Sequence, residues 1–256
     1  MPAQTTAMGK YMYCLIRCSQ PRQFATRGIG ERGDIVYTIG DEELAAVVSD
    51  SPVMEYDCSR RNMMAHTLVL EEVMKEYTIL PIRFDTVAPD AESIQVKLLK
   101  RRGEEIRGHL QVMDGRLELG LKAFWYEEVI FREIVEENPP IRQLRDSLAG
   151  RPSQQSYQDR MRLGEMVAIA VEKKREADAE KILACLRPFC VYLKTTPAVS
   201  DRMILNAAFL VDKPREPEFD LAVQQLDAEM GYRVMFKYVD QVPPYNFVNF
   251  TLNWKE

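Results

Sequence analysis

The segment from Pro243 to Trp254 constrains the fold most, because apolar and polar residues alternate along it. The twin prolines at its start disfavour a helix and favour extended backbone. The apolar positions are Val248, Phe250, Leu252 and Trp254, with Asn249, Thr251 and Asn253 between them. A period of two predicts a half-buried β-strand. Because a strand carries main-chain donors and acceptors along its edges, it must pair with this protein's own sheet or with another chain.

Composition favours a globular protein and excludes several functions. The chain has 256 residues, of which 46% are hydrophobic and 29% charged, enough for one large domain or two ordinary ones. A net charge of -5 without a basic block argues against nucleic-acid binding. No apolar run approaches the roughly 18 residues that cross a bilayer, and the N-terminal apolar stretch is too short for a secretory signal. We therefore expect a soluble, cytoplasmic protein without membrane contact.

The five cysteines are scattered and odd in number, which predicts reduced thiols in a reducing compartment. They have no matching His or Cys cluster that would make a metal site. Thirteen methionines is a high count, and Met suits adaptable apolar surfaces that pack against partners.

Apolar periodicity predicts strands and helices in both halves of the chain. The expected strands cover residues 11–17, 35–39, 44–49, 78–87, 117–125, 203–211 and 232–239. The expected helices cover residues 62–77, 90–110, 126–137, 141–148, a long segment from Ser153 or Ser156 to about Lys194 with a break near Pro188, and 216–230.

Strands that bracket helices in each half predict an α+β fold built from two ferredoxin-like sandwiches. The expected domains are residues 1–113, residues 114–240 with the second sandwich enlarged by the long helical segment, and an extended C-terminal tail of residues 241–256. A turn at Met113, Asp114 and Gly115 sets the first boundary.

The sequence offers no catalytic constellation, no cofactor motif and no metal-ligand set. His66 shares a predicted helix with Glu71 and Glu72, but those carboxylates fall on another face, so we interpret His66 as a structural or surface residue. The glycine-rich GIGERG segment, which starts at Gly28, does not lead from a clear strand into a helix and is a poor dinucleotide loop. The charged run from Glu172 to Lys181 is interpreted as a solvated helix face, with a projecting helical arm as the alternative.

Five residues are candidates for binding a partner. Arg83 and Phe84 lie in a predicted strand interrupted by proline, where the guanidinium is able to reach carbonyl or carboxylate groups or stay at an exposed edge. The other three are Tyr245, Phe247 and Asn249 in the predicted terminal strand.

Four sequence blocks together resemble the gas vesicle protein F/L family. They are Tyr11-Met12-Tyr13, His66 followed by the LPIRFDTV segment of residues 80–87, the LGLKAFW segment of residues 119–125, and the PPYNFV segment of residues 243–248. Relatives often carry Gly at the position of Asp85, and a Gly-Pro pair before the twin prolines, where this chain has Asp240-Gln241-Val242. Both departures concern local turn geometry.

The resemblance implies a non-enzymatic accessory or minor structural protein of gas vesicle formation. It implies a cytoplasmic or vesicle location and contact with the major shell protein, which is small and very hydrophobic, or with other accessory proteins. Two alternatives remain from the residues alone. One is a ligand-sensing or enzymatic ferredoxin-like module. The other is single-stranded RNA binding by the Tyr232–Tyr238 segment, which the acidic net charge disfavours.

Overall fold

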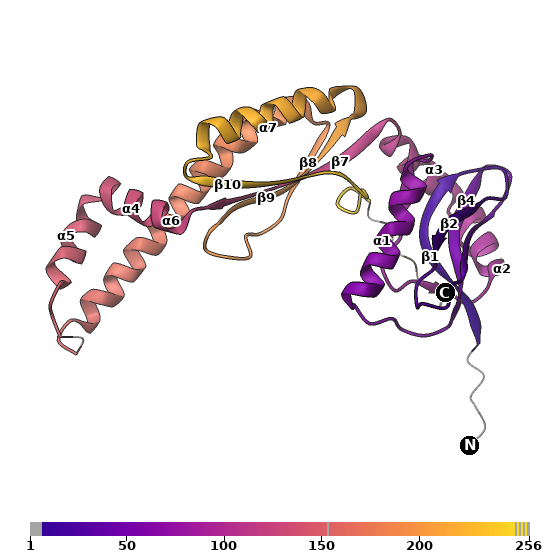
Figure 1. The fold of residues 1–256 in the computed structure, drawn as a ribbon, viewed down its shortest axis with the longest axis horizontal. Helices are drawn as coiled ribbons and strands as arrows, with labels where there is room; N and C mark the ends of the chain where they lie inside the picture. Colours follow the sequence, from indigo (N-terminus) through magenta and orange to yellow (C-terminus); the bar gives the residue numbers. More distant parts are fainter. Residues whose placement is uncertain (1–6, 153, 249, 251, 253, 255–256) are drawn as a thin grey trace, which may run out of the picture. The chain divides into compact units, whose positions relative to one another are not determined.

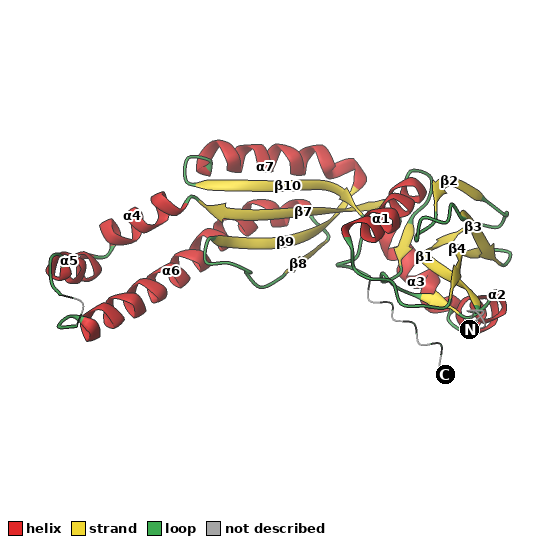
Figure 2. Ribbon diagram, turned by 60° about the horizontal axis from the view of Figure 1, so that its bottom comes forward, coloured by secondary structure: helices red, strands yellow, loops and turns green. Residues whose placement is uncertain are grey.

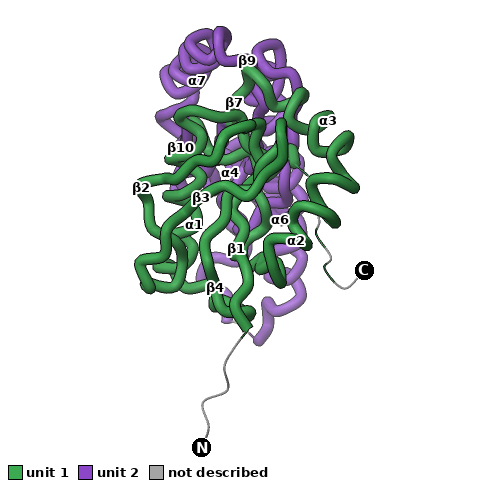
Figure 3. Tube along the Cα trace, turned by 90° about the vertical axis from the view of Figure 1, so that its right-hand side faces the viewer, with its two compact units in different colours: residues 1–118, 241–256 green, residues 119–240 purple. Residues whose placement is uncertain are grey.

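The computed structural model describes residues 7–152, 154–248, 250, 252 and 254 (Figure 1). The chain divides into two compact units (Figure 3). Unit 1 is Met1–Glu118 with Gln241–Glu256, and unit 2 is Leu119–Asp240. The sequence suggests a boundary after Met113 and a separate tail. The structure instead divides the chain after Glu118 and assigns residues 241–256 to unit 1.

Unit 1 is built on a sheet whose central strand, β1, is almost wholly buried. Tyr11 to Ile16 in β1 are 0% exposed, as the aromatic and aliphatic sequence predicts. The strands are β1 (Met8–Arg17), β2 (Gln23–Arg27), β3 (Ile35–Gly40), β4 (Leu44–Pro52), β5 (Ile79–Pro81) and β6 (Val87–Ala88). They are ordered β2-β3-β4-β1-β5, with β6 also paired to β1. Four strands precede the first helix, so this unit differs from the expected ferredoxin-like order.

Two helices of unit 1 begin at polar N-cap residues. Ser59 caps α1 (Arg60–Met74), and Asp90 caps α2 (Ala91–Ser93) by accepting a hydrogen bond from the Ser93 N–H at 2.6 Å. The single helix expected over residues 90–110 is instead three segments, because a π-helical stretch, η1 (Ile94–Lys100), separates α2 from α3 (Gly103–Met113).

The outer strand β2 has its free edge blocked by α1. Pairing with β3 is irregular between Phe24 and Arg27, and the Glu72 carboxylate of α1 accepts hydrogen bonds from the N–H groups of Ala25 and Thr26, both at 2.8 Å. A bulge and a side-chain cap are two ways in which proteins prevent an edge strand from pairing with another chain.

Unit 2 contains a four-stranded sheet with helices on one face (Figure 2). Its strands are β7 (Arg116–Trp125), β8 (Tyr192–Thr195), β9 (Met203–Asp212) and β10 (Val234–Val242), in the order β10-β7-β9-β8. Its helices are α4 (Glu127–Glu137), α5 (Pro139–Leu148), α6 (Tyr157–Leu186) and α7 (Glu216–Met230), with short 3₁₀ turns η2 (Arg187–Phe189) and η3 (Lys213–Arg215). Helix α7 and the C-terminal part of α6 cover one face, and none of the helices described in this unit covers the other (Figures 1 and 2).

The long helix expected from Ser153 or Ser156 to about Lys194 is shorter in the structure. Helix α6 ends at Leu186, and Pro188 lies in η2, because proline cannot continue a helix. The next residues, Tyr192–Thr195, form β8. Along the 30 residues of α6 the buried side chains are Asp178, Ile182 and Leu186, all in its C-terminal part. The N-terminal part therefore packs only partially, against α5 and α4.

A buried ionic cluster attaches α4 and α6 to the sheet of unit 2. The Arg233 guanidinium, 8% exposed, donates to Asp178 at 2.8 and 2.9 Å and to Glu133 at 2.8 Å. The Trp125 indole N–H also donates to Asp178, at 2.8 Å. Burial alone would lower the pKa of Arg233, but the bonds to Asp178 and Glu133 outweigh it and raise that pKa. The Arg233 guanidinium thus links helices α4 and α6 to the ends of strands β7 and β10.

Within the described ranges, no helix is both long and apolar enough to cross a lipid bilayer.

Candidate functional site

The C-terminal segment forms a turn where the sequence predicts a strand. The Tyr245 N–H donates to the Pro243 carbonyl at 2.7 Å, and the Phe247 N–H donates to the Pro244 carbonyl at 3.3 Å. The Asn246 side-chain amide donates to Glu118 at 2.6 Å, which fixes the turn to the start of β7. The strand prediction is therefore wrong over residues 243–248. Beyond them, only residues 250, 252 and 254 are described, and none is in a strand.

The turn places Tyr245 beside Arg83 and Phe84, two other candidates from the sequence. Together they line a cavity of about 420 Å³ in unit 1, named here the Tyr245 pocket. Its lining comes from α1 (Met63, His66, Thr67), from β5 and the following segment (Pro81, Arg83, Phe84) and from the C-terminal segment (Tyr245, Val248, Phe250). Phe247 is half-buried and does not line the pocket, and Asn249 lies outside the described residues.

His66 forms the polar floor of the Tyr245 pocket, between two tyrosine hydroxyls. Its Nδ1 is 3.0 Å from the Tyr11 hydroxyl and its Nε2 is 2.9 Å from the Tyr245 hydroxyl. The Tyr11 hydroxyl also accepts a hydrogen bond from the Asp85 N–H at 3.1 Å. This chain of contacts connects the buried β1, helix α1 and the C-terminal turn through one imidazole.

The burial of Tyr11 indicates which nitrogen of the His66 imidazole carries the proton. Tyr11 is 0% exposed, so its hydroxyl proton needs a protein acceptor, and Nδ1 of His66 is the one in reach. Nε2 then carries the proton and donates to the Tyr245 hydroxyl.

His66 is neutral at physiological pH. Burial lowers its pKa from 6.5 to about 4, although the nearby Ile82 carbonyl opposes the shift. Burial also raises the pKa of Tyr11, which keeps its hydroxyl protonated as a donor. The floor of the pocket is therefore uncharged, with the Arg83 guanidinium as the charged group of its lining.

Asp85 adopts an unusual backbone conformation directly beside this network. Its φ is 65°, a region that glycine enters freely and other residues enter at a cost. The Asp85 carboxylate accepts the Tyr56 N–H at 2.7 Å, so the side chain compensates for the conformation. This turn separates β5 from β6 and interrupts the strand expected over residues 78–87.

The sequence identifies the wall of the pocket better than its floor. Arg83, Phe84 and Tyr245 come from the predicted candidates, whereas Tyr11 and Met63 were not among them. His66, interpreted as a structural or surface residue, is buried in the structure, and it also lines the pocket. The signal for Tyr11 is its position in the aromatic and aliphatic run of β1, where a buried hydroxyl needs a polar partner.

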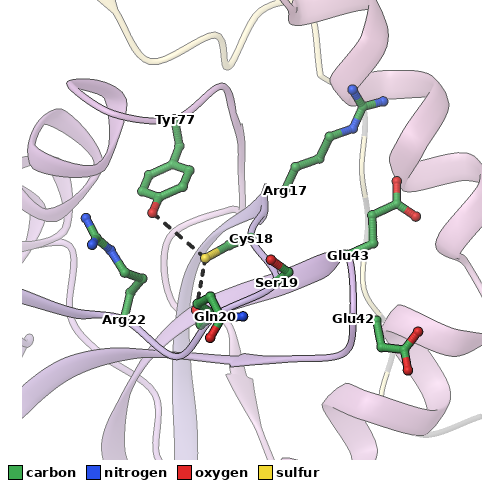
Figure 4. Close-up of a pocket in the computed structure, with 8 residues that line it drawn as sticks. All are labelled: Arg17, Cys18, Ser19, Gln20, Arg22, Glu42, Glu43 and Tyr77. Atoms are coloured by element: carbon green, nitrogen blue, oxygen red, sulfur yellow. Dashed lines mark hydrogen bonds between the residues drawn. The ribbon is translucent and has the colours of Figure 1, made fainter.

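A second depression in unit 1, of about 570 Å³, surrounds Cys18 (Figure 4). The Cys18 thiol donates to the Gln20 carbonyl at 3.0 Å and lies 3.8 Å from the Tyr77 hydroxyl. The other lining residues are Arg17, Ser19, Arg22, Glu42 and Glu43, whose charges are mixed. In the part of the chain that is described, no group of three or more His, Cys, Asp or Glu side chains forms a metal site.

Comparison with known proteins identifies the family of this chain. A sequence model described as "Gas vesicle synthesis protein GvpL/GvpF" matches residues 9–249. The chain belongs to this family. Its role is therefore in gas vesicle formation, and the resemblance in the four sequence blocks is confirmed.

Individual relatives match this chain along nearly its whole length. It is 30% identical over 244 residues to gas vesicle protein F of a Streptomyces species, covering 94% of this chain and 100% of that one. It is 26% identical over 239 residues to gas vesicle protein F of Dolichospermum flosaquae, covering 93% and 96%. The crystal structure of GvpF from an Anabaena species shares its mixed α+β fold, with a TM-score of 0.83 at 24% identity over 95% of this chain and 99% of the other.

Proposed function

We propose that this protein assists gas vesicle assembly in the cytoplasm by binding the major shell protein through the Tyr245 pocket. The observation that carries the proposal is an apolar pocket with an uncharged floor, lined by three residues that the sequence marks as partner-binding candidates. A very hydrophobic shell subunit exposes apolar surface before it polymerises, and such a surface needs a partner. The protein acts by contact and makes or breaks no bond.

The rim of the pocket fits this task. Met63 is 42% exposed and Tyr245 is 41% exposed, so apolar surface is accessible at both sides of the opening. Methionine adapts its shape to different neighbours, and tyrosine offers an aromatic face together with a hydroxyl. Since His66 is neutral, an apolar side chain entering the pocket does not have to desolvate a charge on the floor.

A pair of substitutions in neighbouring residues of α1 tests the contact. Met63 lines the pocket, whereas Met64, 52% exposed, does not, so Met63→Glu places a charge at the opening and Met64→Glu places the same charge elsewhere on that helix. We expect Met63→Glu to abolish co-purification with the shell protein, because a carboxylate resists burial, and Met64→Glu to retain it. Equal binding by both folded variants would reject the pocket as the contact.

We also infer that unit 2 is the enlarged ferredoxin-like sandwich expected from the sequence. Its elements follow the order strand, helices, strand, strand, helix, strand, and its sheet order β10-β7-β9-β8 supports that topology. Helices α4, α5 and α6 take the place of the first helix. A different strand order in an experimental structure of this chain would contradict the assignment.

A further inference from the structure

We infer that the free edge of β10 and the uncovered sheet face beside it bind an extended, acidic segment of another polypeptide. This surface, named here the β10 edge, lies in unit 2 and is separate from the Tyr245 pocket. The inference goes beyond the proposed function, which concerns unit 1 alone.

Two contacts define how β10 lies against β7. The Tyr126 N–H donates to the Arg233 carbonyl at 3.0 Å. Gly120 and Val239 are also neighbours, because the Val239 carbonyl oxygen lies 3.8 Å from the point where a Cβ on Gly120 would be. Tyr126 is thus opposite Arg233, and Gly120 is opposite Val239. Because the residue numbers rise along one strand and fall along the other, the strands are antiparallel. In that register Lys122 lies directly opposite Lys237.

The alternation of an antiparallel ladder then assigns the two sides of β10. In β10, every second residue directs its N–H and C=O groups toward β7 and bonds it. The residues between them direct these groups away from β7, toward the free edge. Phe236 and Tyr238 therefore present main-chain groups at the free edge. In the described part of the chain, β10 ends the order of this sheet, so no further strand lies beyond it.

The uncovered face beside this edge is basic and partly apolar. Lys122 and Lys237 are exposed on it, and the Lys237 ammonium lies 5.5 Å from the centre of the Phe124 ring. Val239 on the same face is 52% exposed and Met235 is 36% exposed. Among the described residues, neither ammonium has an ion-pair partner, and two like charges opposite each other destabilise a strand pair. A carboxylate from a partner would relieve this repulsion.

The same charges select the kind of partner. Pairing two copies of β10 would bring their Lys237 residues together on one face, which disfavours self-association. A single-stranded nucleic acid would need exposed aromatic rings beside the lysines for its bases. The ring at Lys237, Phe124, is half-buried, and the exposed ring of Tyr126 follows only after the end of β7. An added strand satisfies the free main-chain groups, and acidic side chains at alternate positions satisfy the two lysines. An extended acidic segment meets both requirements.

The contrast with unit 1 supports the assignment. There the outer strand β2 has its N–H groups occupied by Glu72 and its ladder disrupted by a bulge. Among the described residues, no side chain bonds the main chain of Phe236 or Tyr238 in this way, and the Tyr238 hydroxyl donates to Asp220 on α7 instead. β10 is also long, at 9 residues, whereas β8 at the opposite edge has 4. The β10 edge is therefore suited to strand addition.

A peptide titration of the full chain tests the inference. The probe is a fluorescent peptide of about 10 residues that alternates Val and Glu, which is long enough to pair along the 9 residues of β10. We expect binding that weakens with added salt and falls by about tenfold in the variant Lys122→Glu/Lys237→Glu. The control Lys100→Glu/Lys173→Glu changes two other exposed lysines by the same charge and should bind normally.

Two further probes make the outcome decisive. The same peptide N-methylated at every residue keeps its charges but has no main-chain N–H group on either edge, so it cannot form a ladder and should not bind. Binding of the methylated peptide as tightly as the unmodified one, or equal binding of a Val-Lys peptide, would overturn strand addition to an acidic segment. Binding of an oligouridylate in preference to the Val-Glu peptide would overturn the choice of partner. Far-UV circular dichroism of both lysine variants verifies that they are folded.

Discussion

At the scale of single residues, the Tyr245 pocket depends on groups whose states are set by burial. His66 is neutral because an imidazolium in its position would lose hydration without gaining a carboxylate partner. Asp85 keeps a strained backbone because its carboxylate and its N–H both make hydrogen bonds, to the Tyr56 N–H and to the Tyr11 hydroxyl. Each of these residues makes a measurable prediction.

Acid should destabilise the protein through His66. Its folded-state pKa of about 4 is below its ordinary 6.5, so the folded state favours the neutral form. The stability that this provides is complete above pH 6.5 and is lost as pH falls toward 4, by about 3 kcal/mol in total. Urea unfolding at pH 7 and pH 4 should show His66→Gln losing less stability than the parent chain by that amount. Parallel losses in the two proteins would contradict the assignment.

Substitutions of Asp85 should separate backbone strain from the lost hydrogen bond. Asp85→Ala removes the acceptor of the Tyr56 N–H and keeps a side chain in the left-handed region, which should cost about 2 kcal/mol of unfolding free energy. Asp85→Gly loses the same acceptor but relieves the strain, so it should be about 1 kcal/mol more stable than Asp85→Ala. Thermal or urea unfolding distinguishes the two. A glycine variant no more stable than the alanine variant would show that the turn is not strained.

At the scale of elements, strong periodic patterns are predicted well from the sequence. Strands β1, β7 and β9 and helices α1 and α7 lie where apolar periodicity expects them. The terminal segment is different, since its alternation reflects Val248 and Phe250 packing into unit 1 without a ladder, at 8% and 7% exposure. Side-chain burial alone produces a period of two, so the pattern cannot distinguish a packed turn from a strand.

The Arg233 cluster should be the most sensitive polar contact among the elements of unit 2. Arg233→Met would leave Asp178 and Glu133 buried without their shared cation, which should cost about 3–5 kcal/mol. The exposed pair of Lys181 and Glu229, at 3.5 Å, provides a control, and Lys181→Met should cost less than about 0.5 kcal/mol. Chemical denaturation measures both. Similar small losses would mean that the cluster adds nothing beyond packing.

At the scale of the whole molecule, the pocket could not be derived from the sequence because its parts are far apart in the chain. His66 and Tyr245 are separated by 179 positions, and their contact exists only because the chain returns to unit 1 after completing unit 2. Sequence patterns report local periodicity, whereas this return is a property of the complete fold. Family resemblance supplies the role in gas vesicle formation that the patterns do not contain.

Because residues 241–256 belong to unit 1, a fragment that lacks them should be less stable than unit 1 in the full chain. A fragment of residues 1–118 lacks Tyr245, Val248 and Phe250, which are packed in unit 1, and should unfold at a lower urea concentration than unit 1 does in the full chain. A synthetic peptide of residues 241–256 added to this fragment should restore part of that stability. Trp125 and Trp254 lie outside the fragment but are present in the full chain, and the added peptide carries Trp254, so far-UV circular dichroism is used to follow unfolding in all three samples. No effect of the peptide would show that the segment contributes little.

The thin packing of the first part of α6 has a consequence for local opening. Amides whose helix is supported by few buried side chains exchange with solvent through small fluctuations, without unfolding of the rest. Deuterium should therefore enter α5 and residues 157–170 of α6 well before it enters residues 178–186, which carry all three of the helix's buried side chains. Helix α6 would then contain two regions that differ in their rate of hydrogen exchange. Its N-terminal part would be free to change conformation on contact with a partner, while its C-terminal part stays ordered.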